Sequence, residues 1–165
     1  MADESSRVGM GGGCHWCTEA VFQALRGVVR VEQGHLRAQA PHGRWSEGVI
    51  VHFDPRRISL ETLIEVHLAT HSATSAHGLR HRYRSAVYVL DDDQARRARA
   101  ALQGLAAGLA EPLQTLVLPL VDFRPSPERY RDYYRKGRER PFSRRYIQPK
   151  LEALQAAFGP WLKGP

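Results

Sequence analysis

The sequence has few cysteines and no long apolar run, and these absences argue against several classes of protein. Only two cysteines occur among 165 residues, too few for the disulfide framework of a small secreted protein. The first residues lack the basic and then apolar pattern of a signal peptide. No apolar run approaches the roughly 20 residues that span a bilayer. We therefore expect a cytoplasmic protein that makes no membrane contact.

Signatures of metal and nucleic-acid recognition are also missing. No second CxxC or HxxxH pair is present to complete a four-ligand structural zinc site. Zinc-finger spacing, an RRM aromatic motif and a heptad zipper are absent as well. The formal net charge is +7, and much of it lies in Tyr130–Lys150, where arginines alternate with tyrosines and acidic residues. We interpret this segment as a solvated basic surface and predict no metal, no cofactor and no nucleic-acid partner.

The hydrophobic pattern predicts a mixed α+β protein in which residues 1–165 form a single domain with frayed ends at 1–6 and 160–165. A helix following Gly13 is expected to end at Gly27, and a second one is expected to begin after a Ser59 cap. The buried stripe of that second helix is predicted to be Leu60, Leu63, Ile64, His67 and Leu68. The other predicted helices are Asp91–Leu109, Pro125–Lys136 and Pro149–Phe158. The predicted strands are Val8–Gly13, Val28–His35, Glu47–Phe53, Ser85–Leu90 and Leu113–Val121.

Strands and helices follow one another without a regular βαβ order, which favours a two-layer α+β sandwich. Between the second helix and the fourth strand lies His71–Tyr83, a polar segment without periodicity. Connections of this length in a small domain are often functional. We therefore expect this segment to contribute to a site.

The most informative stretch is GGGCHWCTEAVFQAL, from Gly11 to Leu25. Cys14 follows a glycine turn at the predicted start of a helix, where free backbone N–H groups and the helix dipole favour a thiolate. Cys17 comes one turn later on the same face, at a spacing where Cβ atoms lie roughly 5–6 Å apart. The two sulfurs are thus close enough for a disulfide after a small adjustment.

Four interpretations of this pair remain open from the residues alone. It is half of a zinc site, the CxxC of a thioredoxin-like oxidoreductase, a pair of inert cysteines in a packed helix, or a nucleophilic redox site. The missing second ligand pair weakens the first. Nucleophilic redox catalysis by Cys14 is the leading interpretation.

Several motifs now indicate a known family. GGGCHWCTEAVF resembles the GGCFW-type signature of the peptide methionine sulfoxide reductase A family. WSEGVIVHFDPRRIS, YRSAVYV and FRPSPERYRDYY follow in the order that this family shows, so the resemblance covers nearly the whole chain. It implies an α+β two-layer sandwich with a ferredoxin-like core and the nucleophile at the N-terminus of the first helix.

The resemblance also implies roles for individual residues. Cys14 falls on the nucleophile that attacks the sulfoxide sulfur, and Trp16 on the aromatic side chain around the substrate methyl group. Glu47 falls on the acid that protonates the sulfoxide oxygen, and Tyr83 on a phenol that hydrogen-bonds this oxygen. Protonation needs a carboxyl group that is neutral near pH 7, which burial achieves. Without the resemblance, Glu47 would be interpreted as an outward-facing charge and Tyr83 as a core tyrosine.

The sequence departs from the family at several positions. His15 stands where phenylalanine is usual, which makes one wall of the methyl pocket more polar. The loop between His35 and Trp45 is shorter and lacks a second tyrosine, and Gly78 stands where aspartate is usual. Ser143 occupies a position that is often a recycling cysteine. We therefore expect Cys17 to resolve the oxidised Cys14, or an external thiol to do so.

Together these observations predict thiol-dependent reduction of methionine S-sulfoxide, free or in proteins, through a sulfenic acid on Cys14. The expected partners are the sulfoxide substrate and a reductant such as thioredoxin, glutaredoxin or a small thiol, and the expected state is a monomer. Two alternatives remain. One is a catalytically weakened redox-sensing or binding module on the same fold, which the missing tyrosine and aspartate suggest. The other is a thioredoxin-like disulfide oxidoreductase.

Overall fold

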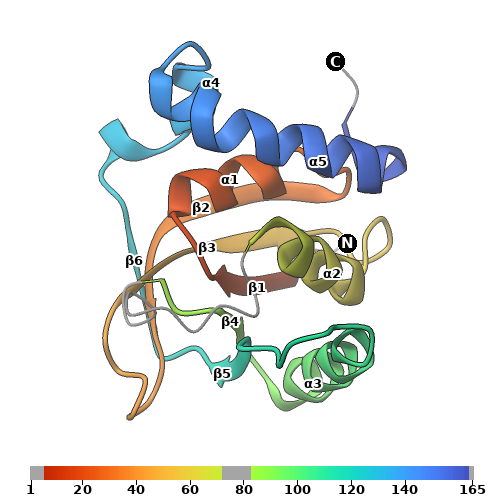
Figure 1. The fold of residues 1–165 in the computed structure, drawn as a ribbon. Helices are drawn as coiled ribbons and strands as arrows, with labels where there is room; N and C mark the ends of the chain where they lie inside the picture. The colour runs from red at the N-terminus through yellow and green to blue at the C-terminus, as the bar shows by residue number, and fades with distance from the viewer. Residues whose placement is uncertain (1–5, 72–82, 164–165) are drawn as a thin grey trace.

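A computed structural model describes residues 6–71 and 83–163 and contains a six-stranded sheet (Figure 1). The strands are β1 (Ser6–Gly11), β2 (Val28–Arg37), β3 (Ser46–Phe53), β4 (Ala86–Val89), β5 (Leu116–Pro119) and β6 (Asp122–Pro125). Their order across the sheet is β5-β4-β1-β3-β2-β6. All neighbours are antiparallel except β4 and β5, which run parallel.

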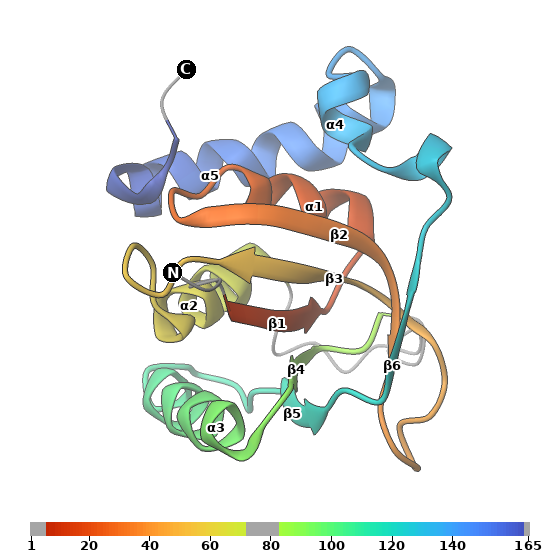
Figure 2. The same cartoon turned by 180° about the vertical axis from the view of Figure 1, so that it is seen from behind.

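The central part of the fold confirms the predicted architecture. The helices are α1 (His15–Gln23), α2 (Leu60–Thr70), α3 (Asp92–Ala106), α4 (Tyr133–Lys136) and α5 (Gln148–Phe158). The chain runs β1-α1-β2-β3-α2-β4, and these four strands lie side by side as β4-β1-β3-β2. This antiparallel βαββαβ arrangement is the ferredoxin-like core that the resemblance implied. Both views show α5 lying along α1 (Figures 1 and 2).

The main core lies between the sheet and its helices. Because side chains alternate along a strand, Val49, Val51 and Phe53 of β3 enter this core together with residues of α1, α2, α3 and α5. Ile50 points to the opposite face, where a smaller cluster includes Leu36 and Tyr88. Glu47 shares the parity of Val49, so the same alternation directs it toward the helix side of the sheet. Gly11 pairs with Gly48, so β3 brings Glu47 to the end of β1, where α1 begins.

The start of α2 follows its predicted chemistry. Ser59 is the N-cap, and its hydroxyl oxygen accepts a hydrogen bond from the Thr62 backbone N–H at 3.0 Å. The buried face consists of Leu60, Leu63, Ile64, Val66 and His67, whereas Leu68 is only partly buried. The longest described helix, α3, has 15 residues. Within residues 6–71 and 83–163, no helix is long and apolar enough to cross a membrane.

The predicted helix at Pro125–Lys136 is wrong. Residues Asp122–Pro125 instead form edge strand β6, which pairs with β2, and a short 3₁₀ helix, Glu128–Tyr130, precedes α4. Pro125 and Pro127 have no backbone N–H to donate and restrict the residues before them, which prevents a continuous helix. The predicted strand Leu113–Val121 is correspondingly shorter, at Leu116–Pro119.

Candidate active site

Glycines shape the approach to Cys14. Gly12 has a φ of 157°, and a Cβ there would lie 2.5 Å from the His71 ring, so a side chain at this position would collide with it. A Cβ at Gly13 would meet nothing within 4 Å. The chain thus turns tightly out of β1 and leaves open space beside the next residue. Cys14 follows as the N-cap of α1, and its carbonyl accepts hydrogen bonds from the N–H groups of Cys17 and Thr18.

The two cysteines differ in their protonation. The Cys17 thiol donates a hydrogen bond to the Cys14 sulfur and lowers the pKa of Cys14 to about 5. A hydrogen bond from His15 and the backbone N–H of Trp16 also lower it, whereas burial and the Glu47 charge raise it. The same sulfur pair and burial raise the pKa of Cys17. At neutral pH, Cys14 is therefore a thiolate and Cys17 a thiol, which is the arrangement a nucleophile requires.

Cys17 is buried against residues 142–151 of the C-terminal part of the chain. Its side chain is 6% exposed and packs with Ala20 and Ile147, and Cys14 contacts the edge of this cluster. A buried position protects the thiol from external reagents but leaves it in contact with its neighbour one turn away. The pair is thus placed for chemistry between the two sulfurs.

Glu47 is buried beside the start of α1, which overturns its interpretation as an outward-facing charge. Only 5% of the residue is exposed. Its Oε1 accepts a hydrogen bond from the His15 backbone N–H at 3.2 Å and lies 3.1 Å from His15 Nδ1. The Cys14 sulfur, a ring nitrogen of His15 and a Glu47 oxygen lie within 4.8 Å of one another. The fold thus brings a thiolate, an imidazole and a carboxyl group together.

Trp16 belongs to an aromatic cluster that sequence analysis did not predict. Its ring stacks on Tyr133, with the ring centres 4.0 Å apart and the planes 7° apart. Phe142 meets the Trp16 ring edge-on at 5.4 Å, and Tyr130 lies tilted at 6.5 Å. Tyrosines in the FRPSPERYRDYY motif were the available signal, but their partner depends on the fold.

Two cavities flank Cys14–Trp16. One, of about 380 Å³, is lined by Glu47, Trp16, His15, His35 and Tyr130 among others. The other, of about 330 Å³, is lined by Cys14, Cys17 and Tyr83 and by residues of α2 and the C-terminal segment. Tyr83 therefore lines the same cavity as Cys14, while Glu47 lines the neighbouring one. The remainder of the predicted functional segment, residues 72–82, lies outside the described residues, as does Gly78.

Glu19 is a buried carboxyl group that sequence analysis missed. It is 2% exposed, and its Oε1 accepts hydrogen bonds from Gln33 Nε2 at 3.0 Å and the Tyr133 N–H at 3.2 Å. Its Oε2 accepts one from the Asp132 N–H at 2.9 Å. Burial raises the pKa of Glu19 despite these donors. The carboxyl group fixes the backbone that carries Tyr133 over Trp16.

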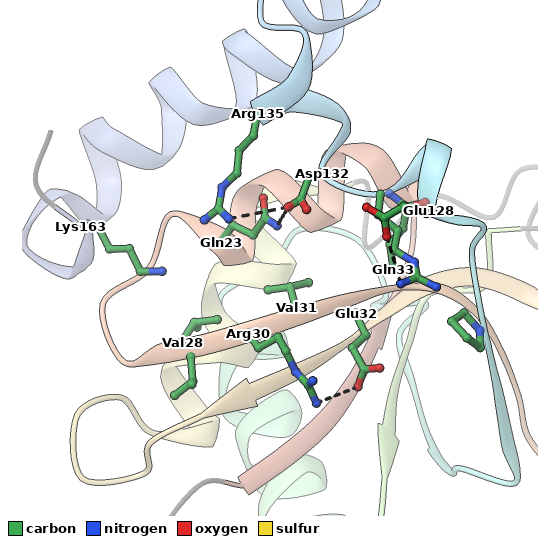
Figure 3. Close-up of a pocket in the computed structure, with 13 residues that line it drawn as sticks. Gln23, Val28, Arg30, Val31, Glu32, Gln33, Glu128, Asp132, Arg135 and Lys163 are labelled. Carbon is green, nitrogen blue, oxygen red and sulfur yellow. Dashed lines mark hydrogen bonds and ion pairs between the residues drawn. The ribbon is translucent and has the colours of Figure 1, made fainter.

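A third cavity is lined by Gln33 and Asp132, two of the residues that donate hydrogen bonds to Glu19. It has a volume of about 320 Å³ and is bordered by α1, β2 and residues 128–135 (Figure 3). Gln23 Nε2 donates to Asp132 Oδ1 at 2.7 Å, and Arg135 lies 3.7 Å from the same oxygen. Arg30 pairs with Glu32 and Arg131 with Glu128 in this lining, and none of the lining residues belongs to the cysteine site.

Comparison with known proteins assigns the chain to a family. The sequence model described as Peptide methionine sulfoxide reductase matches residues 6–160. A relative named Peptide methionine sulfoxide reductase MsrA, from Thermus thermophilus, is 34% identical, with 90% of this chain and 93% of the relative covered. The chain belongs to the peptide methionine sulfoxide reductase family. This membership confirms the predicted thiol-dependent reduction of methionine sulfoxide, a peptide-methionine (S)-S-oxide reductase activity.

Solved structures agree with this assignment. Methionine sulfoxide reductase A of Corynebacterium diphtheriae is 25% identical, with a TM-score of 0.69 and coverage of 81% of this chain and 76% of that one. Mxr1 from Saccharomyces cerevisiae in complex with Trx2 is 17% identical, with a TM-score of 0.65 and coverage of 78% and 85%. At that identity the yeast structure supports the fold alone. Neither the binding-module nor the thioredoxin-like alternative is favoured by these findings.

The structure also shows the surroundings of two residues that depart from the family signature, Ser143 and His15. Ser143, the position at which the resemblance implies a recycling cysteine in other members, is completely buried, and its hydroxyl donates to the Gly137 carbonyl at 2.8 Å. His15, which replaces phenylalanine, turns its ring toward Glu47 and lies edge-on to His35 with 5.5 Å between ring centres. A histidine therefore lies beside the Glu47 carboxyl group, at the position where the sequence resemblance predicts phenylalanine.

Proposed function

We propose that Cys14 is the nucleophile of sulfoxide reduction and that Glu47 delivers the proton that the reaction consumes. The Cys14 thiolate attacks the sulfoxide sulfur while the oxygen is protonated. Transfer of that oxygen to the cysteine sulfur leaves methionine and a sulfenic acid on Cys14. The observation that carries this proposal is the buried Glu47 carboxyl group, whose oxygen lies within 4.8 Å of the thiolate of the first helix.

The surrounding side chains account for substrate binding in this proposal. Trp16 and His15 line the cavity that also contains Glu47, so they form the walls for the methyl group of the substrate. Tyr83 lines the cavity on the nucleophile's other side and supplies a phenol to the sulfoxide oxygen. The S-sulfoxide of methionine, free or within a protein, is the proposed substrate.

Cys17 is the proposed resolving residue. Its thiol already hydrogen-bonds the Cys14 sulfur, and the chain has no third cysteine. Attack of Cys17 on the sulfenic acid forms a Cys14–Cys17 disulfide and releases water. A dithiol reductant, or two molecules of a small thiol, then receives the oxidising equivalents through thiol–disulfide exchange. Thioredoxin, glutaredoxin and a small thiol are the candidates; Mxr1 from yeast, which shares the fold, has been solved in complex with Trx2. A reducing cytoplasm and a monomeric state complete the proposal.

Turnover of the separated S and R sulfoxides of dabsylated methionine, with dithiothreitol as reductant, tests the assignment. We expect turnover of the S form, and no turnover in Cys14→Ser. Retained turnover in Cys14→Ser would remove the nucleophile assignment. A folded wild type without turnover of either form would leave a binding module.

Intact mass tests the resolving step. After one equivalent of methionine sulfoxide without reductant, wild type should lose about two hydrogens and resist alkylation. Cys17→Ser should instead gain one oxygen that a sulfenic-acid reagent traps. A trappable sulfenic acid that persists equally in both proteins would refute the role of Cys17 and indicate direct reduction by an external thiol.

A further inference from the structure

We propose that Cys14, His15 and Glu47 form a binding site for a zinc ion, and that zinc at this site blocks the nucleophile reversibly. Zinc is bound in proteins by thiolate, imidazole and carboxylate groups. Cys14 and His15 lie at the start of α1, and Glu47 is the second residue of β3, so two elements supply the three potential ligand atoms. The binding itself does not depend on the proposed reaction, whereas the inhibition rests on the proposed role of Cys14.

The distances are close to those of a three-ligand site. With zinc bonds of about 2.0–2.3 Å, neighbouring ligand atoms in a tetrahedron lie roughly 3.3–3.6 Å apart. His15 Nδ1 and Glu47 Oε1 are 3.1 Å apart, and all three atoms lie within 4.8 Å of one another. The longest of these separations therefore exceeds the tetrahedral spacing by about 1 Å at most.

The orientation of His15 places Nδ1 directly against the carboxyl group of Glu47. Nδ1 is buried and makes no hydrogen bond within the described residues, although Glu47 Oε1 is near. An unprotonated Nδ1 would bring its lone pair against a carboxylate oxygen at this distance. A divalent cation bonded to both atoms removes that repulsion. Binding releases any proton from the Cys14 thiol to solvent, and no atom changes its oxidation state.

The site also has room for the remaining ligand of the metal. His15 and Glu47 border the cavity of about 380 Å³, so a water molecule can complete a tetrahedron. With one thiolate, one carboxylate and one neutral imidazole, the two negative charges balance those of Zn²⁺. Because the thiolate would be occupied by the metal, it could not attack a sulfoxide until the zinc was removed.

Direct binding of the metal alone tests the site. Zinc affinity is measured by competition with a chromophoric chelator, and Co²⁺ is added separately as a spectroscopic probe. We expect one tight zinc ion per chain and a sulfur-to-cobalt charge-transfer band, both lost in Cys14→Ser. His15→Phe should weaken zinc binding by about 10-fold or more, since it removes one of three ligands. The matched control is His42→Phe, a histidine in the loop between β2 and β3, which should bind zinc as wild type does. Equal affinities of wild type, Cys14→Ser and His15→Phe would overturn the proposal.

Labelling of the wild-type protein provides a test that needs no variant. Saturating zinc should protect Cys14 from iodoacetamide, and a chelator should restore labelling and sulfoxide reduction together. Labelling that is unchanged by zinc would refute the site. Loss of the proposed function has a different signature: a chain that binds zinc through Cys14 but shows no turnover in metal-free buffer would retain the site and refute the reaction.

Discussion

Replacing Glu19 with glutamine tests how the backbone of Asp132 and Tyr133 is held next to α1. The substitution keeps the shape of the side chain, but all three of its partners are donors: Gln33 Nε2 and the N–H groups of Asp132 and Tyr133. A glutamine has one oxygen to accept and an NH₂ group that donates. Its best orientation places the oxygen at the Oε1 position, which serves two donors, and leaves the NH₂ group facing the Asp132 N–H.

The expected cost follows from that unsatisfied donor. A buried donor without a partner costs about 1–3 kcal/mol, and the partial exposure of Asp132 places the value near the lower end. We therefore expect Glu19→Gln to lower the free energy of unfolding by about 1–2 kcal/mol in urea titrations at pH 7. Glu65→Gln, the same change at an exposed position of α2, should stay within about 0.5 kcal/mol of wild type. If Glu19→Gln lowered the free energy of unfolding by less than about 0.5 kcal/mol, the hydrogen bonds of Glu19 to residues 132 and 133 would not have the proposed stabilising role.

The pH dependence of the same pair of proteins has a definite sign. Burial raises the pKa of Glu19 above its ordinary value of 4.5. The protonated Glu19 side chain therefore adds to the free energy of unfolding. This contribution is fully present below pH 4.5 and is lost as the pH rises through the pKa of Glu19 in the folded state. Glutamine does not titrate, so the advantage of wild type over Glu19→Gln should shrink as the pH rises above 4.5. An advantage that grows across this range would mean that the three donors outweigh the burial of the carboxylate.

The position of Cys14, the proposed nucleophile, could be predicted because its signals are local. Three glycines, a cysteine and an apolar helical pattern are adjacent in the chain, and the structure places Cys14 at the N-cap of α1. The Ser59 cap was found for the same reason. The ferredoxin-like order of the strands came from the family resemblance, since element patterns alone indicated only a two-layer α+β sandwich.

Residues whose roles depend on strand register or on distant segments could not be predicted from the pattern. Glu47 meets His15 because β3 pairs with β1 in one register, and the two residues are 32 positions apart in the sequence. The role of Glu19 has no local signal, because its partners at Asp132 and Tyr133 are more than a hundred residues away in the sequence. The error at Pro125–Lys136 has a different origin: the segment was predicted to be helical, but the two prolines and the pairing of β6 with β2 determined the structure.

Three further predictions concern the active site. If Glu47 supplies the proton, Glu47→Gln should lower turnover by about 10²–10⁴-fold with little change in substrate binding; turnover within about threefold of wild type would assign protonation to another donor. Tyr133→Ala removes the ring stacked on Trp16, so KM should rise more than kcat falls, by about 2–10-fold for a stacking loss of roughly 0.5–1.5 kcal/mol; an unchanged KM would separate the stack from binding. The last prediction concerns the Cys14 thiolate, measured as the rate of iodoacetamide labelling in buffer with a chelator. The pKa of Cys14 is lowered to about 5, so the thiolate fraction rises through pH 5 and the rate should level off by about pH 7. Because the Cys17 hydrogen bond is the largest contribution to that lowering, Cys17→Ala should move the inflection upward, toward the pKa of roughly 8.5 of an ordinary thiol. A wild-type rate that still climbs between pH 7 and 9 would show that Cys14 is not a stabilised thiolate, and an inflection unchanged in Cys17→Ala would show that the neighbouring thiol does not stabilise it.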